Sequence, residues 1–343
     1  MKKILITGGA GFIGSHTAVS LLEAGFEPVI IDDFSNSEAS VLDGLKKITG
    51  KDILLHRGDC TDRDFVEQIF NKHEFVGVIH FAAFKAVGES TQNPLKYYHT
   101  NIASLVVLLE AMKSHKVHNL VFSSSCTVYG QPDELPVREN TPRKNAESPY
   151  GNTKKICEDI LRDYIVSGAE TKIISLRYFN PVGAHASGLI GELPLGVPNN
   201  LVPFITQTAA GIREKLTVFG DDYETPDGSC VRDYIHVMDL ADAHVKALDY
   251  LLKGEEPLYE IFNVGTGNGN TVLEVIHAFE KVTGEKLNYQ IGPRRPGDVV
   301  KVWASTEKIT SELGWKPKYS LEDSMRDSWN WQRQLSTRTL QAD

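Results

Sequence analysis

The chain has 343 residues, of which 36 are Lys or Arg and 45 are Asp or Glu, so its formal net charge at pH 7 is −9. This length is about twice that of a typical domain and predicts one large or two unequal hydrophobic cores. With 41% hydrophobic and 24% charged residues, the composition is that of an ordinary globular protein, which excludes collagen-like, disordered and coiled-coil proteins. The acidic balance argues against nucleic-acid binding, which usually needs a broad basic surface.

The first half of the chain alternates short β-rich apolar runs with helical segments. The predicted strands are residues 3–7, 28–32, 53–57, 77–81, 119–123 and 172–177. The predicted helices between them cover residues 11–24, 39–49, 62–72, 94–115 and 149–166. This alternation is typical of an α/β protein of the Rossmann type, with a doubly wound parallel sheet and helices on both faces.

From about Asn180, Gly, Pro and Asn separate shorter elements, and we expect a smaller α/β C-terminal substrate lobe. Residues 1–179 form the predicted dinucleotide-binding domain, and residues 231–262 are expected to return to it. Residues 180–230 and 263–343 form the predicted second lobe. A cleft between the lobes would lie at the carboxyl ends of the strands, where ligands of open α/β sheets bind.

The cysteines and the apolar runs indicate the compartment. The chain contains four widely separated cysteines, Cys60, Cys126, Cys157 and Cys230. They form no C-x-x-C or Cys/His pattern, so we expect neither a disulfide framework nor a metal site. The apolar run at residues 4–6 is too short for a signal peptide, and no stretch approaches the ~18 apolar residues of a membrane span. We therefore expect a cytoplasmic protein that does not enter the membrane.

A glycine-rich segment, Thr7–Gly14, follows the first strand and opens the first helix. It matches G-x-G-x-x-G at Gly9, Gly11 and Gly14, and G-x-x-G-x-x-G at Gly8, Gly11 and Gly14. Glycines there permit a tight turn and let backbone N–H groups approach a pyrophosphate at the helix N-terminus. An ordinary glycine-rich turn is the alternative, but the strand-to-helix context favours dinucleotide binding.

Acidic residues follow the next two strands. Asp32 ends the second strand, where a carboxylate accepts hydrogen bonds from the adenosine ribose and repels a 2′-phosphate, which favours NAD over NADP. Asp59 follows the third strand. It could reach the adenine amino group, or it could cap the helix that starts near Thr61, and the sequence leaves both interpretations open.

A serine-rich strand end, Ser123–Ser125, is followed by Tyr150 and Lys154, which lie four residues apart on one face of a predicted helix. A free tyrosine has a pKa of about 10. Two positive charges, Lys154 and an oxidised nicotinamide ring, would lower the pKa of Tyr150 toward neutrality and allow it to act as a base. An exposed helical pair is the commoner meaning of Y-x-x-x-K alone, but this context favours catalysis.

Together, Thr7–Gly14, the serine cluster and the Tyr150/Lys154 pair resemble the extended short-chain dehydrogenase/reductase family. Further segments are similar to the UDP-glucose 4-epimerase family: His80–Ser90, Arg177–His185, Pro198–Leu201 and Val231–Val237. The likeness runs from Lys3 to about Trp331. It implies inversion at C4 of UDP-glucose and UDP-galactose by transient hydride transfer to tightly bound NAD, through a 4-keto intermediate.

The resemblance also implies which residues form the site. Ser125 would bond the reacting sugar hydroxyl, Tyr150 would be the base and Lys154 would hold the nicotinamide ribose. Besides these three, NAD contacts are expected at Gly8, Gly11, Phe12, Ile13, Gly14, Asp32, Asn36, Asp59, Cys60, Phe81, Ala82, Lys85, Asn101 and Phe179. Besides Ser125 and Tyr150, UDP-sugar contacts are expected at Lys85, Asn180, Asn200, Leu201, Thr217, Phe219, Arg232, Arg295, Asp298 and Val302.

Val302 bears on sugar specificity. It occupies a position where family members confined to UDP-glucose and UDP-galactose often carry tyrosine. A smaller side chain would leave room for an acetamido group, so UDP-GlcNAc and UDP-GalNAc could also be substrates, or UDP-N-acetylglucosamine 4-epimerisation could be the main activity. The alternative is that bulk elsewhere compensates for Val302.

Two other functions are less well supported by the residues. A nucleotide-sugar 4,6-dehydratase needs an Asp-Glu pair where this chain has Cys126 and Thr127. A non-enzymatic member would not need Ser125, Tyr150 and Lys154.

Because many relatives pair through two long helices, the resemblance also implies a homodimer, with residues 94–115 and 149–166 as the counterparts.

Overall fold

The computed structural model describes residues 1–295 and 298–342, with side chains described up to residue 337. Its largest sheet has seven parallel strands in the order β11-β6-β5-β4-β1-β2-β3. These strands are β1 (Lys3–Thr7), β2 (Glu27–Asp32), β3 (Leu54–Arg57), β4 (Phe75–His80), β5 (Asn119–Ser125), β6 (Lys172–Tyr178) and β11 (Leu258–Val264). The predicted Rossmann-type class is confirmed.

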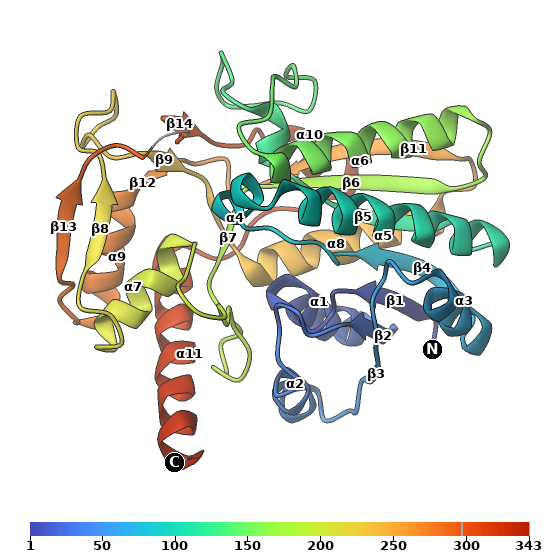
Figure 1. Cartoon of the computed structure of the whole chain (residues 1–343), viewed down its shortest axis with the longest axis horizontal. Coiled ribbons are helices and arrows are strands. Elements are labelled where there is room, and N and C mark those ends of the chain that lie inside the picture. Colours follow the sequence, from blue (N-terminus) through green and yellow to red (C-terminus); the bar gives the residue numbers. More distant parts are fainter. Residues whose placement is uncertain (296–297, 343) are drawn as a thin grey trace.

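Helices cover both faces of this sheet (Figure 1). On one face, Ile4 and Ile6 contribute to a core with α1 (Phe12–Glu23), α2 (Val41–Thr49), α8 (Val237–Lys253) and α10 (Glu307–Leu313). On the other, Leu5 contributes to a core with α3 (Arg63–Lys72), α5 (Pro94–Ser114) and α6 (Pro149–Val166). Because strand side chains alternate between faces, a strand covered on both sides must be apolar throughout, as Ile4–Ile6 is.

The strand order reverses at β1, which lies between β2 and β4. Thr7, the last residue of β1, is in register with Ile31 and with His80. The chain that follows β4 stays beside this end, because Phe81 N donates to Thr7 O at 3.0 Å. In open α/β sheets, ligands bind outside the carboxyl ends of the strands at such a reversal.

A second core lies beside the sheet, on the left of Figure 1. It is formed by α7 (Leu201–Ala209), α9 (Val272–Thr283), α11 (Leu321–Ala342) and β8 (Leu216–Phe219). β8 pairs in parallel with β13 (Tyr289–Gly292), whose residues are mostly exposed. Small sheets join β7 (Asn180–Val182) to β10 (Tyr234–His236), and β9 (Val231–Arg232) to β12 (Asn270–Thr271) and β14 (Lys301–Val302). The remaining short helices are α4 (Val87–Gln92) and the 3-10 turn η1 (Cys126–Tyr129).

The predicted strands and helices of the first half are present, with ends shifted by a few residues. No strand was predicted at β11, although α8 and β11 both lie with the large sheet. The lobe boundaries remain a prediction, since Ile309 and Trp315 from the C-terminal segment also pack into a core of that sheet. Across residues 1–295 and 298–342, the structure has no helix with the length and apolarity needed to cross a bilayer.

Candidate active site

The glycine-rich turn brings the ends of β1 and β4 together. Gly8 has φ +68°, in the left-handed region, and a Cβ there would lie 2.8 Å from the backbone nitrogen of Ala82. At Gly14, a Cβ would lie 2.7 Å from Cα of Gly9 and would also clash with the carbonyl oxygen of Gly8. Only glycine therefore permits this approach.

The N-terminus of α1 fits an anionic pyrophosphate. Gly11 is the N-cap in extended geometry, and among the described residues no side chain caps this end or places an acid in its first turn, where Phe12 and Ile13 begin the helix. Its partial positive charge is therefore available to a ligand.

Asp32 ties the glycine-rich turn to the loop after β2. The carboxylate accepts hydrogen bonds from Ala10 N at 2.9 Å, Phe34 N at 2.9 Å and Ser37 Oγ at 2.7 Å. Its side chain is nearly buried, and this held carboxylate stands where an adenosine ribose is expected. Asn36 lies in the same loop and is exposed.

The segment after β3 carries two further residues that were assigned to NAD. Asp59 is not a helix cap: its Oδ1 accepts from Thr61 N at 2.8 Å, and Asp62 caps α3. The alternative that Asp59 caps this helix is therefore wrong, because the capping residue is Asp62. Cys60 is buried in the core beneath, and burial raises the pKa of its thiol, so its side chain is an apolar group here.

The loop after β4 is held by Asn101 of α5. The Asn101 side chain accepts from Phe84 N at 2.9 Å and donates to Phe84 O at 3.0 Å and to Thr153 Oγ1 at 3.1 Å. Its amide is thus engaged with the chain itself, which places the loop containing Phe81, Ala82 and Lys85.

Lys85 reaches from this loop to the segment between β7 and α7. Its Nζ donates to Glu192 Oε1 at 3.1 Å, and Asn200 Nδ2 donates to the same oxygen at 2.6 Å. Asn200 is the N-cap of α7, which begins at Leu201. The Glu192 carboxylate therefore joins Lys85, which is expected to contact both NAD and the UDP-sugar, to Asn200, which is expected to contact the UDP-sugar.

The reactive residues meet at the end of β5. Ser125, its last residue, accepts hydrogen bonds from Thr127 N at 3.2 Å and Thr127 Oγ1 at 3.0 Å. Helix α6 starts directly before Tyr150, where Ser148 caps Gly151 N and Pro149 occupies the first turn. Lys154 is almost fully buried, and its Nζ donates to Ser123 O at 2.7 Å. This bond brings the Tyr150/Lys154 face against the serine strand.

Burial shifts the pKa values of both Tyr150 and Lys154. Burial raises the pKa of Tyr150 to about 12, and the hydrogen bond with Ser125 opposes that shift only in part. Burial lowers the pKa of Lys154 to about 8, while Cys157 and Glu158 favour its charged form. Lys154 therefore does not outweigh the burial of Tyr150, and the expected lowering of the Tyr150 pKa would depend on the second positive charge, that of the oxidised nicotinamide.

Several residues assigned to the UDP-sugar gather on β7, β9, β14 and the loop before β14. Asp298 pairs with Arg295 at 2.7 Å and lies 3.9 Å from Arg232, so two guanidinium groups share one carboxylate. Val302 is in register with Arg232, and its buried side chain joins a small core with Phe179. The excess positive charge suits a diphosphate.

The other residues assigned to the sugar nucleotide lie around this group. Asn180 N donates to Asp233 O at 3.0 Å, which fixes β7 beside β10. Phe219 is exposed at the end of β8, and the Arg295 guanidinium lies 5.4 Å from its ring centroid. Thr217 accepts from Gln290 Nε2 at 3.3 Å, within the β8–β13 pair.

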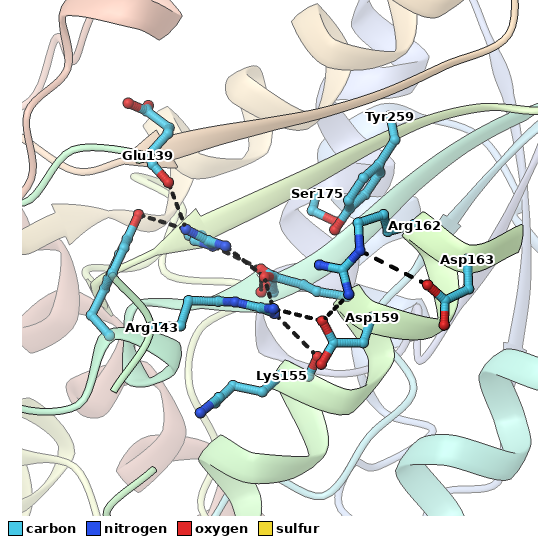
Figure 2. A network of polar contacts seen from close by, with 12 residues as sticks. Glu139, Arg143, Lys155, Asp159, Arg162, Asp163, Ser175 and Tyr259 are labelled. Carbon is cyan, nitrogen blue, oxygen red and sulfur yellow. Dashed lines mark hydrogen bonds and ion pairs between the residues drawn. The ribbon is translucent and has the colours of Figure 1, made fainter. Parts of the chain in front are cut away.

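A buried polar network supports the reactive end, and its residues were not predicted as part of the site. Glu158 of α6 pairs with Arg177 of β6 at 2.6 Å, with both side chains almost fully buried. Figure 2 shows its outward continuation, in which Arg143 reaches Asp159. Glu158 follows Lys154 by four residues, a spacing that could have identified it, whereas no local signal pointed to Glu192.

Comparisons with known proteins define first a class and then a family. The sequence profile described as GDP-mannose 4,6 dehydratase matches residues 5–328. This match places the chain among the extended short-chain dehydrogenases/reductases.

Closer relatives narrow this class. The chain is 54% identical over 333 residues to UDP-glucose 4-epimerase 2 of Arabidopsis thaliana, covering 96% of this chain and 95% of that protein. The solved UDP-glucose 4-epimerase of Stenotrophomonas maltophila, with bound NAD and formylated UDP-arabinopyranose, superposes with a TM-score of 0.96 at 47% identity, covering 98% and 100% of the two chains. That of Bifidobacterium longum, in complex with NAD+ and UDP, gives a TM-score of 0.93 at 46% identity, covering 97% and 98%. The chain belongs to the UDP-glucose 4-epimerase family.

Proposed function

We propose that this chain interconverts UDP-galactose and UDP-glucose by inverting C4 of the sugar, with NAD as its resident cofactor. The observation that carries the proposal is the Lys154–Ser123 hydrogen bond of 2.7 Å. It fixes the Tyr150/Lys154 helix face beside Ser125. This face lies at the carboxyl ends of the parallel strands, where the glycine-rich turn also lies. Family membership supports the same activity.

NAD, when bound, supplies a hydride acceptor for C4 and, in its oxidised form, the positive charge that favours the Tyr150 phenolate. The residues that would hold it are those of the α1 N-terminus, Asp32, Lys85 and Lys154. Their fit rests on the uncapped helix end and on the held Asp32 carboxylate.

Tyr150 is the proposed base. As phenolate it takes the proton of the C4 hydroxyl while the C4 hydride leaves, which gives a 4-keto sugar. Ser125 orients the hydroxyl, and Tyr150 returns the proton when the hydride comes back to the opposite face of C4. The atoms and electrons balance within one cycle, so no net oxidation occurs.

The sugar must turn between the two half-reactions while the nucleotide stays in place. We infer that Arg232, Arg295 and the N-terminus of α7 at Asn200 hold the diphosphate, because two cations and a helix N-terminus attract it. Firm binding of the nucleotide and loose binding of the sugar permit both faces of C4 to react.

The dehydratase alternative has no suitable acid at its expected positions. Thr127 donates its hydroxyl to Ser125 Oγ at 3.0 Å. Burial raises the pKa of Cys126 to about 12, so its thiol stays protonated and is a poor exchanger of protons near neutral pH. Elimination of the C6 hydroxyl would lack the carboxylic acid that it needs.

The test is conversion of UDP-galactose by the purified chain without added cofactor, with nucleotide products separated by chromatography. The proposal expects UDP-glucose to form until a constant ratio of the two sugars is reached. A 4-keto-6-deoxy product, or unchanged UDP-galactose with NAD present, would overturn it.

Sugar size gives a further prediction. Val302 is buried beside Phe179, and we infer that its small side chain also admits UDP-GlcNAc and UDP-GalNAc. Replacing Val302 by Tyr should lower turnover of the acetylated pair ~10-fold or more relative to the unacetylated pair, because the larger ring fills the space for the acetamido group. If wild type and V302Y discriminate equally between the two sugar pairs, bulk elsewhere sets the specificity.

We also infer a homodimer formed through α5 and α6, which pack side by side and expose apolar residues. Leu95 of α5 is 80% exposed and Val166 of α6 is 81% exposed. Sedimentation of the purified chain should give the mass of two copies, and L95E should yield monomers.

The four free cysteines support placement in the reducing cytoplasm.

A further inference from the structure

We propose that Glu158 is a positioning residue for the reaction. Together with Arg177, it holds the strand end that carries Ser125 in a fixed place relative to the helix face that carries Tyr150 and Lys154. This inference rests on the proposed function, because positioning matters only if these three residues act on one substrate.

Glu158 joins the two segments directly. It follows Tyr150 and Lys154 at successive four-residue steps of α6, so all three lie on the face toward β5. Its Oε1 accepts from Ser124 Oγ at 2.6 Å and from Arg177 Nε at 2.8 Å, and its Oε2 accepts from Arg177 Nη2 at 2.6 Å. Since Ser124 immediately precedes Ser125, the carboxylate ties the helix to the reactive strand end.

Arg177 holds the other side of Ser125. It is in register with Ser124 on the neighbouring strand β6. Its Nη1 donates to Tyr129 Oη at 3.0 Å and to Glu139 O at 3.1 Å. Tyr129 ends η1, the turn that starts directly after Ser125. The segments before and after Ser125 therefore both bond to the same ion pair.

The energetics favour a geometric role over a purely stabilising one. The Arg177 and Glu158 side chains are 2% and 1% exposed, and the cost of removing two charges from water offsets most of their attraction. Apolar side chains of equal volume would stabilise the fold about as well. What the pair adds is a set of directional bonds next to Ser125, where a shift of ~1 Å can cost ~100-fold in rate.

Glu158 also acts on the charge of Lys154. Its carboxylate opposes the lowering of the Lys154 pKa by burial, as does Cys157 on the same helix. The other titratable groups near Lys154 are His80 of β4, Tyr150 of α6 and Tyr178 of β6, which bonds Ser123. Burial keeps His80 neutral, with its pKa lowered to about 3. Without the Glu158 charge, Lys154 would lose its proton at a lower pH.

A matched pair of serine variants tests the positioning role. S124A removes one bond to Glu158 and leaves the ion pair intact. S175A removes an equally buried hydroxyl on β6, which bonds Tyr259 Oη at 3.1 Å. We expect kcat to fall roughly tenfold in S124A, with KM unchanged, and to stay at the wild-type value in S175A, while both variants unfold at similar temperatures. Equal kcat values in S124A and wild type would overturn the proposal.

The pH profile of kcat in E158Q provides a second readout that a merely structural residue would not move. We expect its alkaline limb to shift roughly one pH unit lower, and a folded E158Q with the wild-type profile would contradict the proposal. If E158Q does not fold because Arg177 is left unpaired, the comparison of S124A with S175A decides. Failure of wild type to convert UDP-galactose would instead refute the proposed function.

Discussion

Replacing Tyr150 by Phe should lower kcat by ~1,000-fold while leaving NAD bound to the purified protein. The change removes only the hydroxyl that takes the C4 proton, and a positioned acid or base typically contributes ~10²–10⁴ in rate. NAD should remain because its other proposed contacts, Asp32 and the N-terminus of α1, are untouched. The measurement combines the rate of UDP-glucose formation with the NAD content after denaturation.

Tyr164→Phe is the matched control, because Tyr164 lies on the same helix and packs against the core that α3, α5 and α6 form with the sheet. It should retain wild-type kcat. The assignment of the base would be wrong if Y150F and Y164F had similar turnover. If Y150F also lost its NAD, the lost rate would no longer identify Tyr150 as the base.

Replacing Gly14 by Ala should sharply reduce both the NAD content and the thermal stability of the chain. The added methyl group would clash with the carbonyl oxygen of Gly8 and lie 2.7 Å from Cα of Gly9. These are backbone atoms, which cannot rotate away, so the turn itself must shift. Overpacking of this kind costs ~1–3 kcal/mol, and the displaced turn no longer presents its N–H groups to the pyrophosphate.

Gly88→Ala is the control for G14A. A Cβ at Gly88 would meet no described heavy atom within 4 Å, and Gly88 lies within α4, where alanine is the better helix former. NAD content and melting temperature should match wild type in G88A. A G14A protein that purifies with full NAD would show that this turn does not bind the cofactor.

The sequence predicted those parts of the site that depend on local spacing. The glycine-rich turn could be recognised because its glycines serve one turn between β1 and α1. Tyr150 and Lys154 could be paired because four residues span about one helical turn. The parallel sheet followed from alternating apolar runs and helices, although β11 was missed among residues that return to the sheet late in the chain.

The sequence could not predict contacts made between distant segments. Glu192 meets Lys85 only because the loop after β4 lies beside the segment between β7 and α7, which also holds Asn200. Arg177 meets Glu158 only because β6 lies beside β5 and under α6. The Tyr150 pKa was also out of reach, because burial, which raises it to about 12, depends on packing that local spacing does not describe.

The proposed epimerisation requires that the hydride removed from C4 returns to C4 of the same sugar. UDP-galactose carrying deuterium at C4 tests this directly, by mass spectrometry and NMR of the products formed by the purified chain in ordinary water. We expect UDP-glucose that retains deuterium at C4. Deuterium found at C6 of a deoxy sugar, or lost to water, would contradict it.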